Sequence, residues 1–461
     1  MVGARQPRPN LFFVFADQLR AHEVGCYGGP NAITPNLDRL ASEGVLMERC
    51  IATSPVCTPN RGIMLTGAYP TSTGVLANDL PLREGFPTLG TVCRDAGYRT
   101  GYIGKWHLDG VPRDRFTPPG PRRAGFDDFW SAWNCAHDYY GMRYFRDSDA
   151  VLSSERYEPE VQTDHALEFL EGGDDRPFCL VLSWGPPHDP YDQVPEHCRV
   201  RHDPAKVVLR PNAQPDAPNP LAVGLDCRTT IANYNAAVTA LDEQIGRLVD
   251  WLHEHRLANE TILIVTSDHG DMLWSHGWMK KQLPYEESIR VPLVARWPGR
   301  IPRGSRSRAL IGAVDLVPTL LGLMGLEAPH TVGGTDLSRA LLGEPSQMPE
   351  SALIANYVDS DEAQIQGAPV WRGVRSARYT YVEILGRQPW LLYDNDSDPY
   401  QLRNLAGEDS SREIEASHRQ MLSAWLQQTH DPFLDAPGML GAADMNDLWV
   451  ARESYMELER C

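Results

Sequence analysis

The stretch PVCTPNRGIMLTG, residues 55–67, contains a cysteine where a loop gives way to a helical pattern. Cys57 would lie at the N-terminus of that helix, where free backbone amides and the helix dipole favour negative charge. Arg61, four residues further on, falls on the same face of the helix. No second cysteine completes a Cys-x-x-Cys redox motif. The pattern therefore indicates a nucleophile or an oxyanion site rather than a dithiol.

Polar side chains follow each of four apolar runs that the sequence predicts as buried strands. In open α/β sheets, ligands bind beyond the carboxyl ends of the strands, so these positions are candidates for a site. The carboxylates of Asp17 and Asp268 could meet there at one hard cation. A single Asp after a strand is more often a turn or cap residue, so the prediction depends on the coincidence of all four strand ends. The residues concerned are Asp17-Gln18, Lys105-Trp106-His107, Pro187-His188-Asp189-Pro190 and Asp268-His269-Gly270-Asp271.

Strand and helix patterns alternate along most of the 461 residues. We therefore expect an α/β fold in which helices sandwich a mostly parallel sheet. The predicted strands are 10–17, 98–106, 177–185 and 261–271, and the predicted helices are 34–45, 161–172 and 230–255.

The character of the chain changes near residue 345. Short strand patterns and a closing helix at 411–429 predict a smaller C-terminal α+β unit built on an antiparallel sheet. The expected domains are residues 1–345 and residues 346–461. The tail, 431–461, is too apolar for a free terminus, so we expect it to dock on the body or on a neighbouring subunit of a homo-oligomer.

Composition narrows the classes of partner. The net charge of −18 disfavours nucleic acid and anionic membranes, and an anionic substrate would need a local positive pocket. No apolar run approaches the roughly 20 residues of a membrane span. The first residues contain no secretory signal pattern, which predicts a cytoplasmic protein. The nine cysteines lack metal-site spacing and are expected to be mostly reduced and buried.

Extended to Gly67, the first motif reads Cys-x-Pro-x-Arg-x-x-x-Leu-Thr-Gly. With it, the chain resembles the sulfatase family, a branch of the alkaline-phosphatase-like superfamily. The likeness continues in order through GKWHLDG, PPHDPY, TSDHGDMLWSHG, KQLPYEESIRVPL, DLVPTLLGLMG and LLYDNDSDPYQLRNLA, and covers nearly the whole chain. It implies that a separate formylglycine-generating enzyme oxidises Cys57 to the aldehyde formylglycine, with Pro59 and Arg61 as the recognition signal. Arg61 then supports the modified side chain.

The resemblance also implies a set of site residues. One divalent metal, usually Ca²⁺, is expected, and a group of cationic and imidazole side chains should surround the sulfate. Asn78 resembles a substrate contact of some relatives. The implied metal ligands are Asp17, Gln18, Asp268 and His269 with modified Cys57, and the residues around the sulfate are Lys105, His107, His188 and Lys281.

Two positions depart from the commonest sulfatase pattern. Gln18 replaces an Asp and His269 replaces an Asn, as in choline sulfatases and phosphonate monoester hydrolases. One carboxylate fewer and one imidazole more make Mg²⁺ or Mn²⁺ alternatives to Ca²⁺.

The resemblance implies hydrolysis of a sulfate monoester to an alcohol and sulfate. His188 or Lys281 would protonate the leaving alcohol, and His107 would act as the base that releases sulfate. A phosphonate monoester or phosphodiester hydrolase is the nearest alternative, although such enzymes tend to lack the histidine at position 107. A non-catalytic anion- or sugar-binding protein is the second. The alcohol part stays open between aryl, choline and sugar sulfates.

Overall fold

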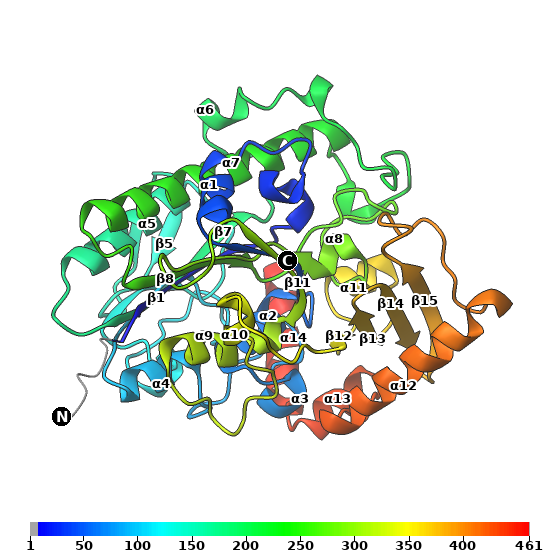
Figure 1. Ribbon diagram of the computed structural model, residues 1–461. Helices are drawn as coiled ribbons and strands as arrows, with labels where there is room; N and C mark the ends of the chain where they lie inside the picture. The colour runs from blue at the N-terminus through cyan, green and yellow to red at the C-terminus, as the bar shows by residue number, and fades with distance from the viewer. Residues whose placement is uncertain (1–7, 461) are drawn as a thin grey trace.

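The computed structural model describes residues 8–460 and is built on one large mixed sheet (Figure 1). Seven of its strands take part in parallel pairings, which are β2–β11, β8–β1, β1–β7, β7–β3 and β3–β4. β10 runs antiparallel between β8 and β2. The order is β11-β2-β10-β8-β1-β7-β3-β4, with β9 beside β2. Its strands are β1 (Asn10–Asp17), β2 (Val45–Ile51), β3 (Arg99–Lys105), β4 (Phe129–Trp133), β7 (Phe178–Pro187), β8 (Thr261–Ser267), β9 (Arg290–Val291), β10 (Val294–Arg296) and β11 (Ser305–Gly312).

Alternating side chains of β1 divide the core into two layers. Phe13 and Phe15 pack with one set of helices, and Phe12 and Val14 pack with the other. The first set covers one face of the sheet and the second covers the opposite face, because successive side chains of a strand point to opposite sides. The first set is α2 (Cys57–Thr66), α4 (Leu89–Asp95) and α9 (Leu316–Met324), and the second is α1 (Pro35–Glu43), α5 (Glu158–Glu171) and α7 (Cys227–Glu254).

A second, four-stranded antiparallel sheet follows in the order β12-β13-β14-β15. Its inward side chains, such as Val374 and Leu392, belong to the same apolar core as Phe13, and the helix α12 contributes Leu422. The two units thus share one core, and the domain boundary at 345 stays a prediction. The elements are β12 (Ser351–Asn356), β13 (Trp371–Ser376), β14 (Tyr379–Ile384), β15 (Gln388–Asp394) and α12 (Arg412–Gln428).

The C-terminal tail docks on the body of the chain. Met439 and Leu440 of α13 (Ala436–Ala442) pack against Leu76, Leu80 and Tyr357. The last helix, α14 (Asn446–Arg460), is drawn red in Figure 1, and the hydroxyl of its Tyr455 accepts a hydrogen bond from the Arg113 amide. The sequence prediction of a docked tail is confirmed for this chain, and homo-oligomer formation stays a prediction.

The remaining elements are short. They are α3 (Pro70–Thr73), α6 (Glu196–Arg199), α8 (Glu286–Ile289), α10 (Ser338–Leu341), α11 (Glu362–Gln366) and the hairpin β5 (Met142–Tyr144) and β6 (Leu152–Ser154). Within residues 8–460, no helix combines the length and the apolar character that crossing a membrane requires.

Candidate active site

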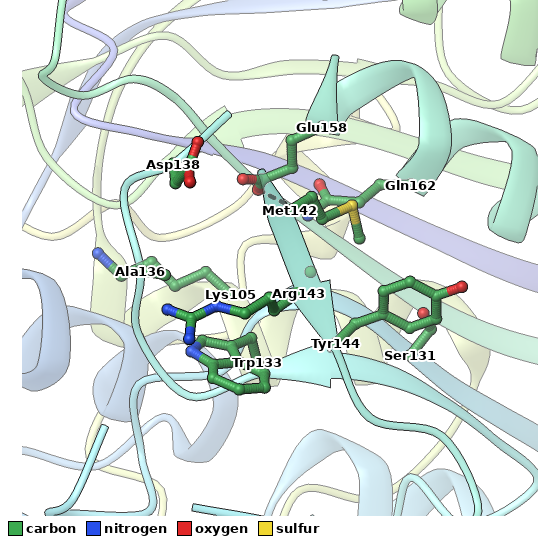
Figure 2. Close-up of a pocket in the computed structure, with 11 residues that line it drawn as sticks. Lys105, Ser131, Trp133, Ala136, Asp138, Met142, Arg143, Tyr144, Glu158 and Gln162 are labelled. Carbon is green, nitrogen blue, oxygen red and sulfur yellow. Dashed lines mark hydrogen bonds between the residues drawn. The ribbon is translucent and has the colours of Figure 1, made fainter. Parts of the chain in front are cut away.

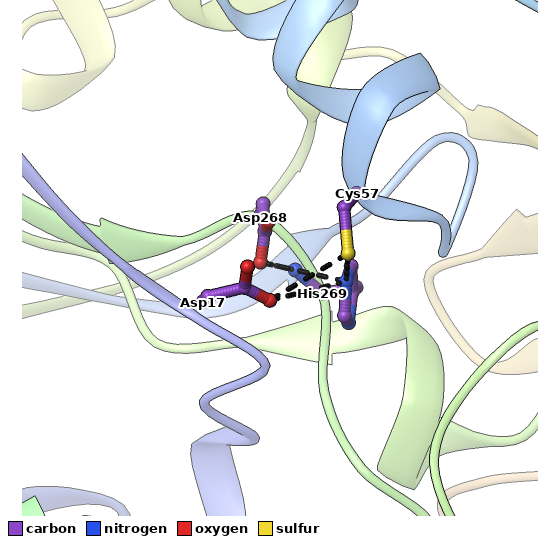
Figure 3. Close-up of side chains that lie close together, drawn as sticks. All are labelled: Asp17, Cys57, Asp268 and His269. Carbon is purple, nitrogen blue, oxygen red and sulfur yellow. Dashed lines mark hydrogen bonds and ion pairs between the residues drawn. The ribbon is translucent and has the colours of Figure 1, made fainter. Parts of the chain in front are cut away.

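Four side chains from three separate segments meet at the carboxyl edge of the large sheet (Figure 3). Asp17 ends β1, Asp268 and His269 follow β8, and Cys57 begins α2. One ligand atom of each lies within 4.8 Å of the others, and all four residues are buried. Side chains as far apart in sequence as Asp17 and His269, which are 252 positions apart, therefore lie together in the fold, as the position of the strand ends predicts.

Arg61 holds the two carboxylates of this cluster. Its Nη2 lies 3.1 Å from Oδ2 of Asp17 and its Nε lies 3.0 Å from Oδ2 of Asp268. The Oδ1 atoms are left on the side of His269, whose Nε2 is 3.6 Å from Asp17 Oδ1 and 3.7 Å from Asp268 Oδ1. Two carboxylate oxygens from the ends of the neighbouring strands β1 and β8 therefore converge where a cation would sit.

The donor set fits a divalent metal. Nδ1 of His269 lies 3.0 Å from the carbonyl oxygen of Gly270, which can only accept, so Nδ1 carries a proton and Nε2 faces the cluster. Burial opposes the imidazolium, but Asp268 and Cys57 outweigh it and raise the pKa of His269 to about 9. Metal binding at Nε2 would release the proton that this nitrogen carries in the imidazolium form.

Cys57 occupies the first position of α2, as the motif predicts. Its Sγ lies 3.1 Å from Nε2 of His269 and 3.7 Å from Oδ1 of Asp17. Burial opposes ionisation of this thiol, but the ammonium groups of Lys105 and Lys281 outweigh burial and lower the pKa of Cys57 to about 6. The site therefore stabilises an anion at position 57.

Lys105 and Lys281 each bring a buried ammonium group close to Cys57. Nζ of Lys105 lies 2.6 Å from Oδ2 of Asp17, and Nζ of Lys281 lies 2.6 Å from Nε2 of His188. Nδ1 of His188 donates a hydrogen bond of 2.9 Å to the carbonyl oxygen of Asp189, so Nε2 accepts a hydrogen bond from the Lys281 ammonium group. Burial and the charge of Lys281 lower the pKa of His188 well below its usual value. His188 is therefore neutral.

Gln18 points toward Lys281 rather than into the cluster of acidic oxygens. Its Oε1 accepts from Nζ of Lys281 at 2.8 Å and its Nε2 donates to Asp271 at 2.7 Å, while its backbone amide donates to Asp268 at 3.0 Å. The carbonyl oxygen is an available ligand type, and its role on a metal stays a prediction.

His107 lies beside the cluster in a separate charged group. Its Nε2 is 3.0 Å from Oδ1 of Asp79, and Arg113 holds both oxygens of that carboxylate at 2.9 and 2.8 Å. Burial opposes the imidazolium, but Cys135 and Asp79 outweigh it and raise the pKa of His107 to about 10.

Asn78 supports the start of α2. Its Oδ1 accepts a hydrogen bond of 3.0 Å from the amide of Thr58, which is one of the unpaired amides of the first turn. Asn78 thereby fixes the position of Cys57, and its proposed contact with substrate stays a prediction.

Two carboxylates near the site, Asp79 and Glu362, were not predicted from the sequence, and Asp271 was predicted only as a strand-end residue without a partner. Asp79 orients His107, Asp271 accepts from Gln18, and Glu362 lies 3.4 Å from Nζ of Lys281. Asp271 belongs to the TSDHGD motif at the end of β8, which places it near Asp268 and His269. Asp79 lies in a turn, and Glu362 begins a helix of only five residues, so neither belongs to a segment long enough to show a periodic pattern.

A small pocket lies next to Lys105 (Figure 2). The side chains of Trp133 and Met142 line it together with Glu158, whose Oε1 accepts from Nε2 of Gln162 at 2.6 Å. Burial raises the pKa of Glu158 to about 7. This carboxyl group is separate from the cluster of Figure 3.

The fold, a mostly parallel sheet between helical layers with Cys57 at a helix N-terminus, is that of the alkaline-phosphatase-like class. The family model "Sulfatase" matches residues 9–326, and the model "N-sulphoglucosamine sulphohydrolase, C-terminal" matches residues 274–428. The chain belongs to the sulfatase family, and the protein is a sulfatase.

Individual relatives cover nearly all of the chain. An ulvan-active sulfatase from Formosa agariphila is 34% identical over 92% of this chain and 82% of its own length. The sulfatase yidJ from Bacteroides fragilis superposes with a TM-score of 0.83 at 32% identity, over 94% of this chain and 98% of that one. A protein solved with its substrate D-glucosamine-2-N,6-O-disulfate gives a TM-score of 0.81 at 25% identity, over 92% and 99%.

Proposed function

We propose that the protein hydrolyses the sulfate monoester of a saccharide, using a formylglycine derived from Cys57 and one divalent metal. The observation that carries this proposal is the position of Cys57 at the start of α2, within 3.7 Å of Asp17 and within reach of two buried ammonium groups. Two of the relatives named above, one active on ulvan and one solved with a glucosamine disulfate as its substrate, support a saccharide as the alcohol part.

The metal would be held by Asp17, Asp268, His269, Gln18 and residue 57. When bound, it supplies a Lewis acid that neutralises charge on the sulfate oxygens. Calcium is the first candidate because the donor set contains two carboxylates, with Mg²⁺ or Mn²⁺ as alternatives. Formylglycine supplies a nucleophile that a thiol cannot replace, and its formation requires a formylglycine-generating enzyme as partner.

The chain's own residues perform the remaining tasks. Lys105 and Lys281 place positive charge around the anionic ester, which lowers the cost of bringing a nucleophile to it. The Lys281 ammonium group carries the proton that it shares with Nε2 of His188, and this pair can pass that proton to the leaving alcohol. His107, held by Asp79 at Nε2, is proposed to take up a proton when sulfate is released. Because its raised pKa favours the imidazolium, only its neutral form can do so. Arg61 keeps both carboxylates in place.

The catalytic unit is proposed to span residues 1–345 and the C-terminal unit residues 346–461. A cytoplasmic location stays a prediction. A phosphonate monoester hydrolase with the same nucleophile is the alternative that Gln18 and His269 leave open.

Mass spectrometry of the Cys57 peptide and an ester panel test the proposal. We expect loss of sulfur from residue 57 and hydrolysis of saccharide sulfates faster than of phosphate diesters and phosphonate monoesters. An unmodified Cys57 in fully active protein would refute formylglycine as the nucleophile. A preference for phosphonates would establish a phosphonate monoester hydrolase instead.

A further inference from the structure

The C-terminal unit contributes a carboxylate to the neighbourhood of the sulfate site. Oε1 of Glu362, the first residue of α11, lies 3.4 Å from Nζ of Lys281. The Lys281 side chain is 1% exposed and that of Glu362 is 13% exposed. Glu362 is therefore the more exposed member of this ion pair.

The second oxygen of this carboxylate is free to accept a hydrogen bond. Within residues 8–460, Oε2 of Glu362 is buried and has no hydrogen-bond partner. Burial opposes ionisation, but Lys281 and Lys280 outweigh it and lower the pKa of Glu362 to about 2. An ionised carboxylate is an acceptor only, and a buried acceptor without a donor is costly. A donor supplied by a ligand would remove that cost.

Glu362 is held rigidly in this position. The amide of Ala363 donates to Oε1 of Gln282, and Nε2 of Gln366 donates to the carbonyl oxygen of Met279 at 2.8 Å. Both contacts tie α11 to the segment that carries Lys281. Such anchoring suits a residue that must present one oxygen to a ligand at a defined distance.

The last helix fixes the residue before Glu362. Asp361 has φ 53° and ψ −117°, a conformation that non-glycine residues rarely adopt. An ion pair with Arg452 of α14 holds it there. The turn into α11 is therefore imposed by its surroundings, and strained backbone of this kind clusters at ligand sites.

The nearby rim of the site carries paired charges. Nζ of Lys280 lies 3.2 Å from Oδ2 of Asp189, and both side chains are partly exposed. Carboxylates at this rim accept hydrogen bonds from hydroxyl groups and repel a second acidic group on the same ligand. The chemistry at this edge matches a polyhydroxylated alcohol.

We propose that Glu362 binds the alcohol part of the substrate by accepting, on Oε2, a hydrogen bond from a hydroxyl group neighbouring the sulfate ester. This inference rests on the proposed function and narrows its substrate class to a sugar sulfate with a free adjacent hydroxyl. Aryl sulfates and choline sulfate offer no such donor, so they lose a charge-assisted hydrogen bond.

A different role for Glu362 makes a different prediction. If the residue acted only by positioning Lys281, its substitution would impair every sulfate ester alike, because Lys281 contacts the group that all esters share. Comparing substrates with and without the adjacent hydroxyl therefore separates the two roles.

The test uses the modified, metal-loaded enzyme with Glu362→Gln, which keeps the shape and removes the charge. The substrates are the hexose monosulfate that the parent hydrolyses best in a panel, its analogue with the adjacent hydroxyl replaced by hydrogen, and 4-nitrophenyl sulfate. We expect the ratio of kcat/KM for the hexose sulfate to that for its deoxy analogue to fall at least about tenfold in the variant. Glu457→Gln, at an exposed position of α14, is the matched control and should keep the parent's ratio.

Equal losses on all three substrates would overturn the proposal in favour of a role through Lys281, and no loss on any would overturn it outright. A parent that hydrolyses no sulfate ester would refute the proposed function itself, which is a distinct result. If thermal unfolding shows that Glu362→Gln is not folded, Glu362→Asp replaces it, since it withdraws the oxygen while keeping the charge. The same fall in the ratio is expected of that variant.

Discussion

Asp17 and Asp268, 251 residues apart in the chain, are joined through one buried guanidinium: Nη2 of Arg61 lies 3.1 Å from Asp17 and Nε lies 3.0 Å from Asp268. All three side chains are completely buried. Because Arg61 occupies the Oδ2 atoms, only the Oδ1 atoms face His269. The arginine of the motif thus positions two carboxylates of the proposed metal site as well as lying four residues from Cys57.

Arg61→Lys tests this relationship. A lysine keeps one positive charge but cannot hold two carboxylates at once, since it lacks the planar fork of donors. We expect metal affinity to fall by about 10- to 100-fold, as for other groups that orient ligands. Calorimetric titration of metal-free protein with Ca²⁺, Mg²⁺ and Mn²⁺ measures it, and unchanged affinity would show that the carboxylates are positioned without Arg61.

Substitutions of Cys57 test the nucleophile. The side chain lies at a helix start and adds little core volume, so Cys57→Ala should fold and lose activity by several orders of magnitude. Cys57→Ser keeps a hydroxyl but cannot be converted to the aldehyde, so a single burst without steady-state turnover is expected. Rapid-quench kinetics measures both, and a Cys57→Ala variant within about tenfold of the parent would eliminate residue 57 as nucleophile.

Removal of the metal should affect stability as well as turnover. Asp17, Asp268 and His269 bring two negative charges into a buried cluster, and a bound cation stabilises only the folded chain. We expect exhaustive chelation to abolish activity and lower the Tm, and a divalent cation to restore both. Full activity in protein shown by elemental analysis to be metal-free would contradict the ligand assignment.

Periodic segments were predictable from the sequence. The strand 10–17 and the helix 230–255 are buried, apolar and regular, and the structure has them as β1 and α7 with nearly the predicted bounds. Residues at the ends of such strands, Asp17 and Lys105, were therefore placed correctly at the same edge. The docked tail followed from its apolar side chains.

The sequence did not predict β11 and β2, the first two strands at one edge of the large sheet. β2 carries half-buried Glu48 and Arg49 within an otherwise apolar run, and β11 alternates serines with exposed arginines. Their pattern lacks the continuous apolar character of central strands. Glu362 and Asp79 were missed for another reason: their positions depend on how loops pack, and loop conformations are set by tertiary contacts rather than by local sequence.

His107 is tested by separating kcat from KM. If its imidazole moves a proton during release of sulfate, His107→Ala should lower kcat by about 10²- to 10⁴-fold with a smaller change in KM. Steady-state kinetics gives both values, and His330→Ala, an exposed histidine, is the matched control. A rise in KM with kcat unchanged would assign His107 to binding the anion and would strengthen the phosphonate hydrolase alternative.

Glu158 gives a prediction for stability against pH. Burial raises its pKa from 4.5 to about 7, so the folded state binds this proton more tightly than the unfolded state does. Its contribution to stability therefore falls as pH rises from about 4.5 to about 7 and then stays low.

Glu158→Gln keeps the acceptor for Gln162 and removes the charge. At pH 5 the variant and the parent should have similar free energies of unfolding, whereas at pH 8 the variant should be more stable by up to about 3 kcal/mol, because one pKa unit corresponds to about 1.4 kcal/mol. Urea unfolding at both pH values measures the difference. Glu171→Gln, at the exposed end of the same helix, should show no such dependence. A variant that tracks the parent at both pH values would show that Glu158 ionises at its usual pKa despite its burial.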